Sequence, residues 1–337
     1  MLKGVIHMKK TVKKILALCL SAVLVASLFA GCSSNSGETG KYNIGILQAV
    51  QHDALDAATE GFQAAVTAAL GSENVEFNLQ NAGGDSPTCA TIANQFVADG
   101  VDLIMANATA ALQASMAATA DIPIVATSIT DYATALEIDQ ANWTGLTGIN
   151  VTGTSDLAPL DEQAAMIQEL CPDAQTVGIL YCSAEPNSQY QAKVISESLT
   201  SMGLTVNEYT VADTNEIATV TTTATQEVDV IYIPTDNTIA SATAAVEQVA
   251  GPAGIPIIAG EEGICKGCGV GTLSISYYDI GYRAGEMAVQ ILTQDANPAE
   301  MEIEYATDLT KKYVADRATS LGITIPADYE AIDMSAE

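Results

Sequence analysis

The sequence predicts an α/β protein with two doubly wound parallel-sheet lobes joined by a multi-strand hinge. Between residues 41 and 337, short runs rich in Val and Ile alternate with Ala-rich segments of helical length, which is the pattern of parallel strands covered by helices. Three short hydrophobic segments occur twice in the same order, and the third follows the first at an interval of 78 positions in both halves. Repetition at a fixed spacing favours two lobes of similar plan.

Each repeated segment begins an expected strand. The pairs are Ile44–Leu47 with Val177–Leu180, Val101–Ile104 with Val228–Ile231, and Asp121–Val125 with Gly254–Ile258. Helices between the strands have recognisable ends. Ser86-Pro87 supplies an N-cap and a proline at the first helical position, and Asp99-Gly100 ends that helix.

The lobes are expected to exchange segments near the end of the chain. We expect the first lobe to comprise residues 41–152 with about 276–305, and the second lobe residues 153–275 with about 306–337. A helix from Asp279 to about Thr293 precedes a tail that crosses back between the lobes. Because ligands of open α/β sheets lie beyond the carboxyl ends of the strands, the two lobes should enclose a cleft there.

The chain begins with a segment typical of a secretory signal. Lysines at positions 9, 10, 13 and 14 precede an apolar run from Ile15 to Phe29, which is too short to span a bilayer. The run ends at Leu28-Phe29-Ala30-Gly31-Cys32, which resembles the lipidation motif of bacterial lipoproteins. We expect residues 1–31 to be removed and Cys32 to carry the lipid. An ordinary signal peptide or an uncleaved anchor is the alternative.

The expected mature protein is strongly acidic. Residues 32–40 are predicted to be a flexible tether, which holds the lobes at the extracytoplasmic face of the membrane. Removal of residues 1–31 leaves 7 of the 12 basic residues and all 41 acidic residues, a formal net charge of −34. Such a surface repels nucleic acid and anionic lipid headgroups, so nucleic-acid binding is excluded.

Four loops at the expected strand ends carry a family resemblance. They are Gly45-Ile46-Leu47-Gln48 with His52 to Asp56, Ala126 to Asp131, Pro234 to Thr238, and Tyr278 to Gly281. In this order they resemble the substrate-binding lipoproteins of ABC transporters in the tryptophan/tyrosine-type family, which have the type I periplasmic-binding fold. Asp53 and Tyr132 depart from the family pattern, in which proline is expected at both positions.

The resemblance implies capture of an aromatic amino acid or a related small molecule for a permease and its ATPase. We expect a monomer with no cofactor or metal. The resemblance places Gln48, His52 and Asp131 in ligand loops. His52 either caps the first helix or contacts the ligand. A sugar- or nucleoside-binding lipoprotein and a ligand-binding sensor lipoprotein remain the alternatives.

A zwitterionic ligand needs one group that binds its carboxylate and another that binds its ammonium, and the sequence contains candidates for both. Thr109 and Ala110 open a helix whose unpaired backbone N–H groups suit a carboxylate, and the Thr130 hydroxyl can add a hydrogen bond. Asp236, beside Asn237 at a strand end, is the predicted acceptor for the ammonium group. The competing interpretation is that Asp236 or Asn237 merely caps the next helix.

Three tyrosines lie at predicted strand ends and can stack on an aromatic ring. Tyr181 and Tyr278 are taken as ligand candidates beside Tyr277, and the alternative for each is a half-buried tyrosine at a lobe edge. Of the adjacent acids Glu261 and Glu262, the second is the ligand candidate, whereas a solvated turn is favoured for the first.

Cys265 and Cys268 have CxxC spacing in a glycine-rich stretch that is interpreted as a loop. A local disulfide is the favoured expectation, with a free thiol pair next, and redox chemistry or half of a zinc site as the other meanings of this spacing. An enzyme is not expected, because the mature chain has a single histidine and none of the common nucleophile, nucleotide or zinc-protease motifs.

Overall fold

The computed structural model describes residues 40–335. The predicted lipidation site Cys32, the expected signal segment 1–31 and nearly all of the expected tether lie outside these residues. Within the described part of the chain, no helix has both the length and the apolar character needed to cross a membrane.

The first lobe is built on a six-stranded sheet with the strand order β11-β5-β4-β3-β1-β2, in which every pairing is parallel. Its strands are β1 (Tyr42–Gln48), β2 (Val75–Asn81), β3 (Leu103–Asn107), β4 (Ile124–Ile129), β5 (Val151–Ser155) and β11 (Glu304–Tyr305). Central strands are buried along their whole length, as expected for a parallel sheet covered on both faces.

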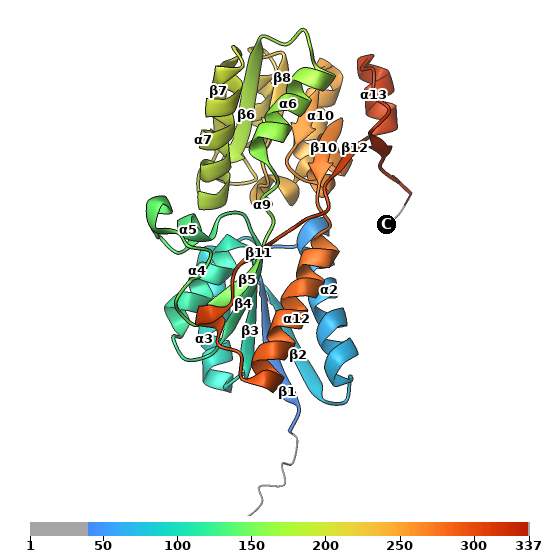
Figure 1. The fold of residues 1–337 in the computed structure, drawn as a ribbon. Coiled ribbons are helices and arrows are strands. Elements are labelled where there is room, and N and C mark those ends of the chain that lie inside the picture. The colour runs from blue at the N-terminus through green and yellow to red at the C-terminus, as the bar shows by residue number, and fades with distance from the viewer. Residues whose placement is uncertain (1–39, 336–337) are drawn as a thin grey trace, which may run out of the picture. The chain divides into compact units, whose positions relative to one another are not determined.

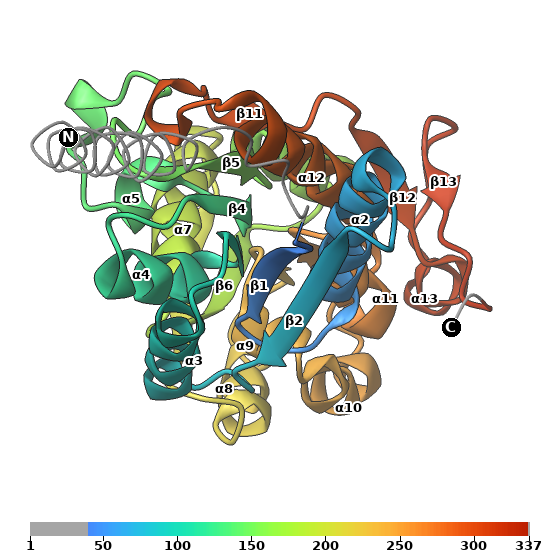
Figure 2. The same ribbon diagram turned by 90° about the horizontal axis from the view of Figure 1, so that it is seen from below.

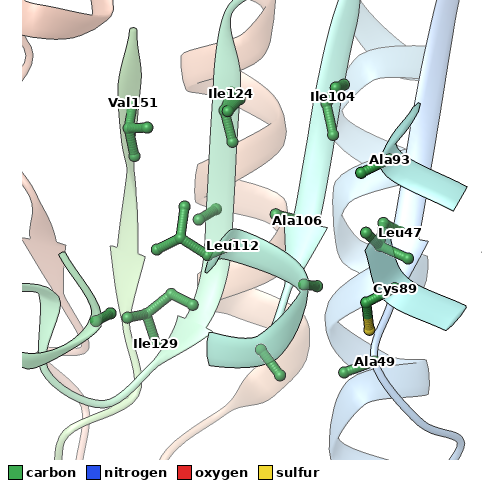
Figure 3. Packing of buried hydrophobic residues seen from close by; sticks show 14 of the residues in the cluster. Leu47, Ala49, Cys89, Ala93, Ile104, Ala106, Leu112, Ile124, Ile129 and Val151 are labelled. Carbon is green, nitrogen blue, oxygen red and sulfur yellow. The ribbon is translucent and has the colours of Figure 1, made fainter. Parts of the chain in front are cut away.

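Helices cover both faces of this sheet, as Figure 1 shows. One face is covered by α2 (Asp53–Leu70) and α12 (Tyr277–Gln294), and the other by α3 (Ser86–Asp99) and α4 (Thr109–Ala118). Side chains from β1, β3, β4, β5, α3 and α4 meet in the core on the second face (Figure 3). This burial of Ile, Leu, Val and Ala side chains is the main source of the lobe's stability.

The second lobe is built on a seven-stranded sheet with the order β13-β12-β10-β9-β8-β6-β7. Its strands are β6 (Thr176–Cys182), β7 (Thr205–Val211), β8 (Val230–Ile233), β9 (Ile257–Ala259), β10 (Gly271–Ser274), β12 (Thr310–Tyr313) and β13 (Glu330–Ala331). Strand β12 runs antiparallel to β10, whereas the other pairings are parallel. The prediction of two doubly wound lobes with mainly parallel sheets is therefore confirmed.

Helices also cover both faces of the second sheet. One hydrophobic cluster contains residues of α6 (Leu160–Leu170), α7 (Pro186–Ser201) and α13 (Ala315–Leu321). The other contains residues of α8 (Ile217–Ala224), α9 (Asn237–Ala240), α10 (Thr243–Ala253) and α11 (Glu262–Cys268). Short elements α5 (Tyr132–Ala135), η1 (Gln140–Asn142) and η2 (Pro298–Glu300) belong to the loops of the first lobe.

The chain passes between the lobes after β5, after β10 and after β11. As a result α12 lies beside α2 and β11 lies beside β5, although each pair is far apart in the sequence (Figure 2). The helix expected from Asp279 begins two residues earlier, at Tyr277, because the Ser276 side chain caps it by accepting a hydrogen bond from Asp279 N. The hinge segments therefore lie next to the carboxyl ends of strands in both lobes.

Candidate ligand-binding site

A pocket lies between the two lobes at the carboxyl ends of their strands. The first lobe contributes His52, Leu55, Ser128, Thr130 and Asp156, the second Asn187, Thr235, Asp236, Asn237, Ala240 and Glu261, and Tyr277 begins α12 at the hinge. The cavity volume of this pocket is about 10 Å³, about the space of one water molecule, whereas small-molecule pockets have roughly 300–1,000 Å³. The pocket is therefore nearly closed in this arrangement of the lobes, and a solute enters it when the lobes separate or the lining side chains move.

Asp156 lies at the hinge directly after β5. Its Oδ2 atom accepts a hydrogen bond of 2.8 Å from the Tyr277 hydroxyl, whereas its Oδ1 atom is buried with no hydrogen-bond partner. Burial raises the pKa of this carboxyl, although the hydrogen bond from Tyr277 opposes the shift. Asp156 thus offers a buried acceptor that the protein itself leaves unused.

Ser128 is the second pocket residue with a buried unpaired atom, its Oγ. The register between β4 and β5 shifts between Ala126 and Ile129, and Ser128 adopts a positive φ of 57° within this irregularity. A non-glycine residue in the left-handed region is strained, and such strain is frequent at binding sites. The irregular strand end therefore holds Ser128 in the pocket at a cost in backbone energy.

The second lobe contributes two buried carboxyls that also cap helices. Asp236 accepts hydrogen bonds from Ile239 N at the start of α9 and from Cys182 N at the end of β6. Glu261 accepts from the backbone N–H groups of the first turn of α11. Burial raises the pKa of each to about 7, and the nearby Glu185 adds to the shift at Asp236.

One contact in the pocket joins the lobes directly. Nε2 of His52, which precedes α2, lies 3.2 Å from Oδ1 of Asn237, the first residue of α9. Asn237 Nδ2 donates to Glu185 over 2.7 Å. Burial lowers the pKa of His52 even though Asn237 and the acids around it act in the opposite direction, so the neutral imidazole is favoured.

Of the residues predicted from the sequence, His52, Thr130, Asp236 and Asn237 line this pocket. Asp236 is both a helix cap and a lining residue, so the two interpretations offered for it are compatible. Ala110 instead lines a separate cavity between the lobes. Thr109 is buried at the start of α4 without lining the pocket.

Gln48 and Asp131 do not line the pocket, and each forms hydrogen bonds within the first lobe. Gln48 Nε2 donates to Asp56 Oδ1 over 2.6 Å, and its Oε1 accepts from Thr59. Asp131 caps α5 by accepting a hydrogen bond of 2.7 Å from Thr134 N. Gln48 therefore supports the start of α2, and Asp131 fixes the loop after β4.

Three further candidates lie away from the pocket. Tyr181 donates its hydroxyl to Glu208 on the neighbouring strand β7. Tyr278 is 42% exposed and lines an outer groove. Glu262 lines the same groove and forms a 2.7 Å ion pair with Lys312. In each adjacent pair the other residue, Tyr277 or Glu261, lines both this groove and the pocket.

Sequence reasoning also missed several lining residues. Asp156 and Asn187 were not among the candidates, although Asp156 directly follows a strand and Asn187 lies in the first turn of α7. Ser128 and Thr235 lie in two of the loops that carry the family resemblance, but neither was predicted as a ligand residue. The acid directly after the strand ending at Ser155 was the available signal for Asp156. This acid was not predicted to bind ligand, because the segment around it was interpreted as the junction between the lobes.

The predicted disulfide is not present. Cys265 and Cys268 lie in α11 with free, buried thiols, in place of the expected loop. The Arg317 guanidinium supports the end of this helix, because it donates to carbonyl oxygens there, among them that of Gly267. In residues 40–335, no group of His, Cys, Asp and Glu side chains is arranged to hold a metal ion.

Known proteins are similar to this chain in sequence and architecture. Residues 43–335 match the family model described as ABC transporter substrate binding protein. A tyrosine-binding protein of Clostridioides difficile (strain R20291) is 36% identical over 293 residues, which cover 83% of this chain and 84% of the relative.

Solved structures show the same similarity. An ABC domain from Streptococcus pneumoniae in complex with L-Trp is 34% identical and superposes with a TM-score of 0.81 over 86% of this chain and 97% of that one. A ligand-free, open substrate-binding protein with adhesive properties from Clostridium difficile is 33% identical, with a TM-score of 0.66 over 87% of this chain and 100% of that one. The chain therefore superposes more closely on the L-Trp complex than on the ligand-free, open structure.

The family match covers nearly all described residues, and it confirms the resemblance seen in the strand-end loops. The relatives extend over more than four fifths of the chain at above 30% identity. The chain belongs to the substrate-binding proteins of ABC transporters.

Proposed function

We propose that the protein captures an aromatic amino acid, tyrosine or tryptophan, in the pocket between its lobes and delivers it to an ABC permease driven by an ATPase. The observation that carries the proposal is the charge of the pocket. Asp156, Asp236 and Glu261 line it, and none of the described lining residues is Lys or Arg. A buried acidic lining of this kind favours a ligand with a cationic group and disfavours an anion.

The apolar part of the lining supports an aromatic side chain on the ligand. Leu55, Ala240 and the Tyr277 ring provide apolar surface beside the carboxyls, and stacking on a tyrosine ring adds roughly 1 kcal/mol to burial. The relatives named for tyrosine and bound to L-Trp support the same class. Capture requires no bond to be made or broken, so the proposed role is binding without catalysis.

The location follows from the lipidation motif. We propose that Cys32 is the acylated first residue of the mature protein, which then acts as a monomer at the extracytoplasmic face of the membrane. A short tether keeps the lobes near the permease and raises the effective concentration there. Cys32→Ala should leave ligand affinity unchanged and release the protein from membranes. Retention of the variant in the membrane fraction would contradict the anchor.

The ligand class can be tested with the mature chain from Ser33, which lacks the anchored cysteine. Its melting temperature would be measured with tyrosine, tryptophan, phenylalanine, aliphatic amino acids, sugars and nucleosides, followed by calorimetric titration of each ligand that shifts it. A ligand at 100 times its dissociation constant stabilises the folded protein by about 2.7 kcal/mol. A shift with sugars or nucleosides and none with aromatic amino acids would refute the proposal.

Transport can be separated from sensing in cells. We expect deletion of the gene to abolish uptake of the labelled amino acid at low concentration, and re-expression of the anchored protein to restore it. Unchanged uptake together with an intact affinity in vitro would favour a sensor.

A further inference from the structure

Two buried polar atoms of the pocket have no partner in the protein, Oδ1 of Asp156 and Oγ of Ser128. Asp156 is 6% exposed and Ser128 is 5% exposed. Leaving a buried polar atom without a hydrogen bond costs about 1–3 kcal/mol, and native proteins contain few such atoms. Two of them lining one pocket point to a ligand that supplies both partners.

The two residues lie at the carboxyl ends of neighbouring parallel strands, about two residues apart in register. Ile129, which follows Ser128, pairs with Ser155, which precedes Asp156, and Asp156 N donates to the Ile129 carbonyl over 3.2 Å. The positive φ of Ser128 sets the direction in which its side chain leaves the backbone, and the Tyr277 hydrogen bond to Oδ2 holds the Asp156 carboxylate. The first lobe and the hinge thus place a carboxylate acceptor and a hydroxyl donor on two neighbouring strand ends of one pocket.

The other two acids of the pocket are already engaged. Both carboxylate oxygens of Asp236 accept backbone N–H groups, from Cys182 and Ile239. Both oxygens of Glu261 accept backbone N–H groups of the first turn of α11. Asp156 is therefore the acid among the described lining residues that has one oxygen entirely free.

We propose that Asp156 Oδ1 accepts the ammonium group of the ligand and that the Ser128 hydroxyl donates to its carboxylate. This assignment rests on the proposed function and makes the ligand a free α-amino acid, whose ammonium and carboxylate groups leave the same carbon and match two adjacent strand ends. A carboxylate can only accept, and a hydroxyl can donate, so the roles of the two residues are not interchangeable. The main-chain groups of the ligand then bind at the hinge end of the pocket.

The assignment gives a distinct affinity pattern across three ligands. The first is whichever of L-tyrosine and L-tryptophan binds more tightly. The second is the matching amine, which lacks the carboxylate, and the third is the matching 2-hydroxy acid, which lacks the ammonium. We expect Asp156→Asn to weaken the amino acid and the amine by about 10- to 100-fold, because a hydrogen bond to a charged group is lost. The same variant should affect the 2-hydroxy acid much less.

Ser128→Ala should show the opposite selectivity. We expect it to weaken the amino acid and the 2-hydroxy acid by about 10-fold and to leave the amine unchanged, because the lost donor acts on the carboxylate. Asp308→Asn is the matched control, since Asp308 is an exposed carboxylate of the outer groove and its substitution should change none of the three affinities. Dissociation constants would come from calorimetric titration of the full mature chain.

The outcomes separate the two proposals. If the unsubstituted protein binds tyrosine or tryptophan and Asp156→Asn binds it equally well, the assignment is wrong and the proposed function stands. If the unsubstituted protein binds no aromatic amino acid, both fail. Should a variant not fold, the unsubstituted protein still decides, because a 2-hydroxy acid or an amine that binds as tightly as the amino acid would overturn the assignment.

Discussion

Nε2 of His52 lies 3.2 Å from Oδ1 of Asn237, so one hydrogen bond joins the start of α2 in the first lobe to the start of α9 in the second. Asn237 Nδ2 is held by Glu185, which turns Oδ1 toward the imidazole. His52 therefore donates from Nε2. Separation of the lobes would break this bond, so it stabilises the arrangement in which the pocket is enclosed.

The first prediction concerns this contact. His52→Ala should weaken ligand binding by about 2- to 10-fold, because a hydrogen bond contributes about 0.5–1.5 kcal/mol to the closed form. Calorimetric titration of His52→Ala, Asn237→Ala and the double variant forms a cycle that isolates the coupling between the two side chains. Strictly additive effects of the two substitutions would show that the contact does not contribute to closure.

Much of the fold could be predicted from the sequence because its signals are local. The Val- and Ile-rich segments that recur at the same spacing became β1, β3 and β4 in the first lobe and β6, β8 and β9 in the second. The Ser86-Pro87 and Gly100 signals mark the ends of α3, although Asp85, one residue earlier, is the actual N-cap. Hydrophobic periodicity and helix caps depend on neighbours in the chain, so they can be recognised without knowledge of the tertiary structure.

The site could be predicted only in part, because adjacent residues point to different places. Glu261 faces the pocket as the cap of α11, whereas Glu262 reaches Lys312 in the outer groove. Nothing in two consecutive glutamates distinguishes them. The same holds for Tyr277 and Tyr278, whose directions depend on how α12 packs against α2. Such choices are made by long-range packing, which a sequence pattern does not reveal.

The α11 thiols give a second prediction. Cys265 and Cys268 are almost fully buried, and burial raises the pKa of both thiols, so little reactive thiolate forms. We expect iodoacetamide to leave both unmodified in the native protein and to modify both after denaturation without reductant, as read by peptide mass spectrometry. Cys171, which is partly exposed, is the internal control and should react earlier. A requirement for reductant would instead indicate a disulfide.

A third prediction tests the contact between α2 and α12. Gly281 of α12 lies so close to α2 that a Cβ atom there would overlap the Ala58 carbonyl. Gly281→Ala should lower the free energy of unfolding by at least about 1–3 kcal/mol, the usual cost of overpacking. Gly251→Ala is the control, because Gly251 is exposed in α10 and a Cβ there meets a flexible Glu247 side chain. Pro252 follows Gly251 in the helix and disfavours a Cβ on the residue before it, so this change should cost about 1 kcal/mol or less. Equal losses in both variants would contradict the prediction.

The buried carboxyls predict an unusual dependence of stability on pH. Asp236 and Glu261 ionise near pH 4 in an unfolded chain, whereas burial raises the pKa of each to about 7 in the folded protein. Between these values the folded state holds more protons than the unfolded state, so the free energy of unfolding decreases as pH rises from about 4 to about 7. His52 acts in the opposite direction, because its lowered pKa means that the unfolded state binds its proton first as pH falls.

With two acids against one histidine, we expect the melting temperature of the ligand-free protein to fall between pH 5 and pH 8. The raised pKa of Asp156 adds to the same trend, whereas Glu304 and Asp328 have lowered pKa values and titrate below this window. The variant Asp236→Asn with Glu261→Gln loses acceptors for backbone N–H groups and should melt lower at every pH, but its melting temperature should vary less with pH. Equal slopes for the two proteins would mean that these carboxyls stay ionised in the folded state.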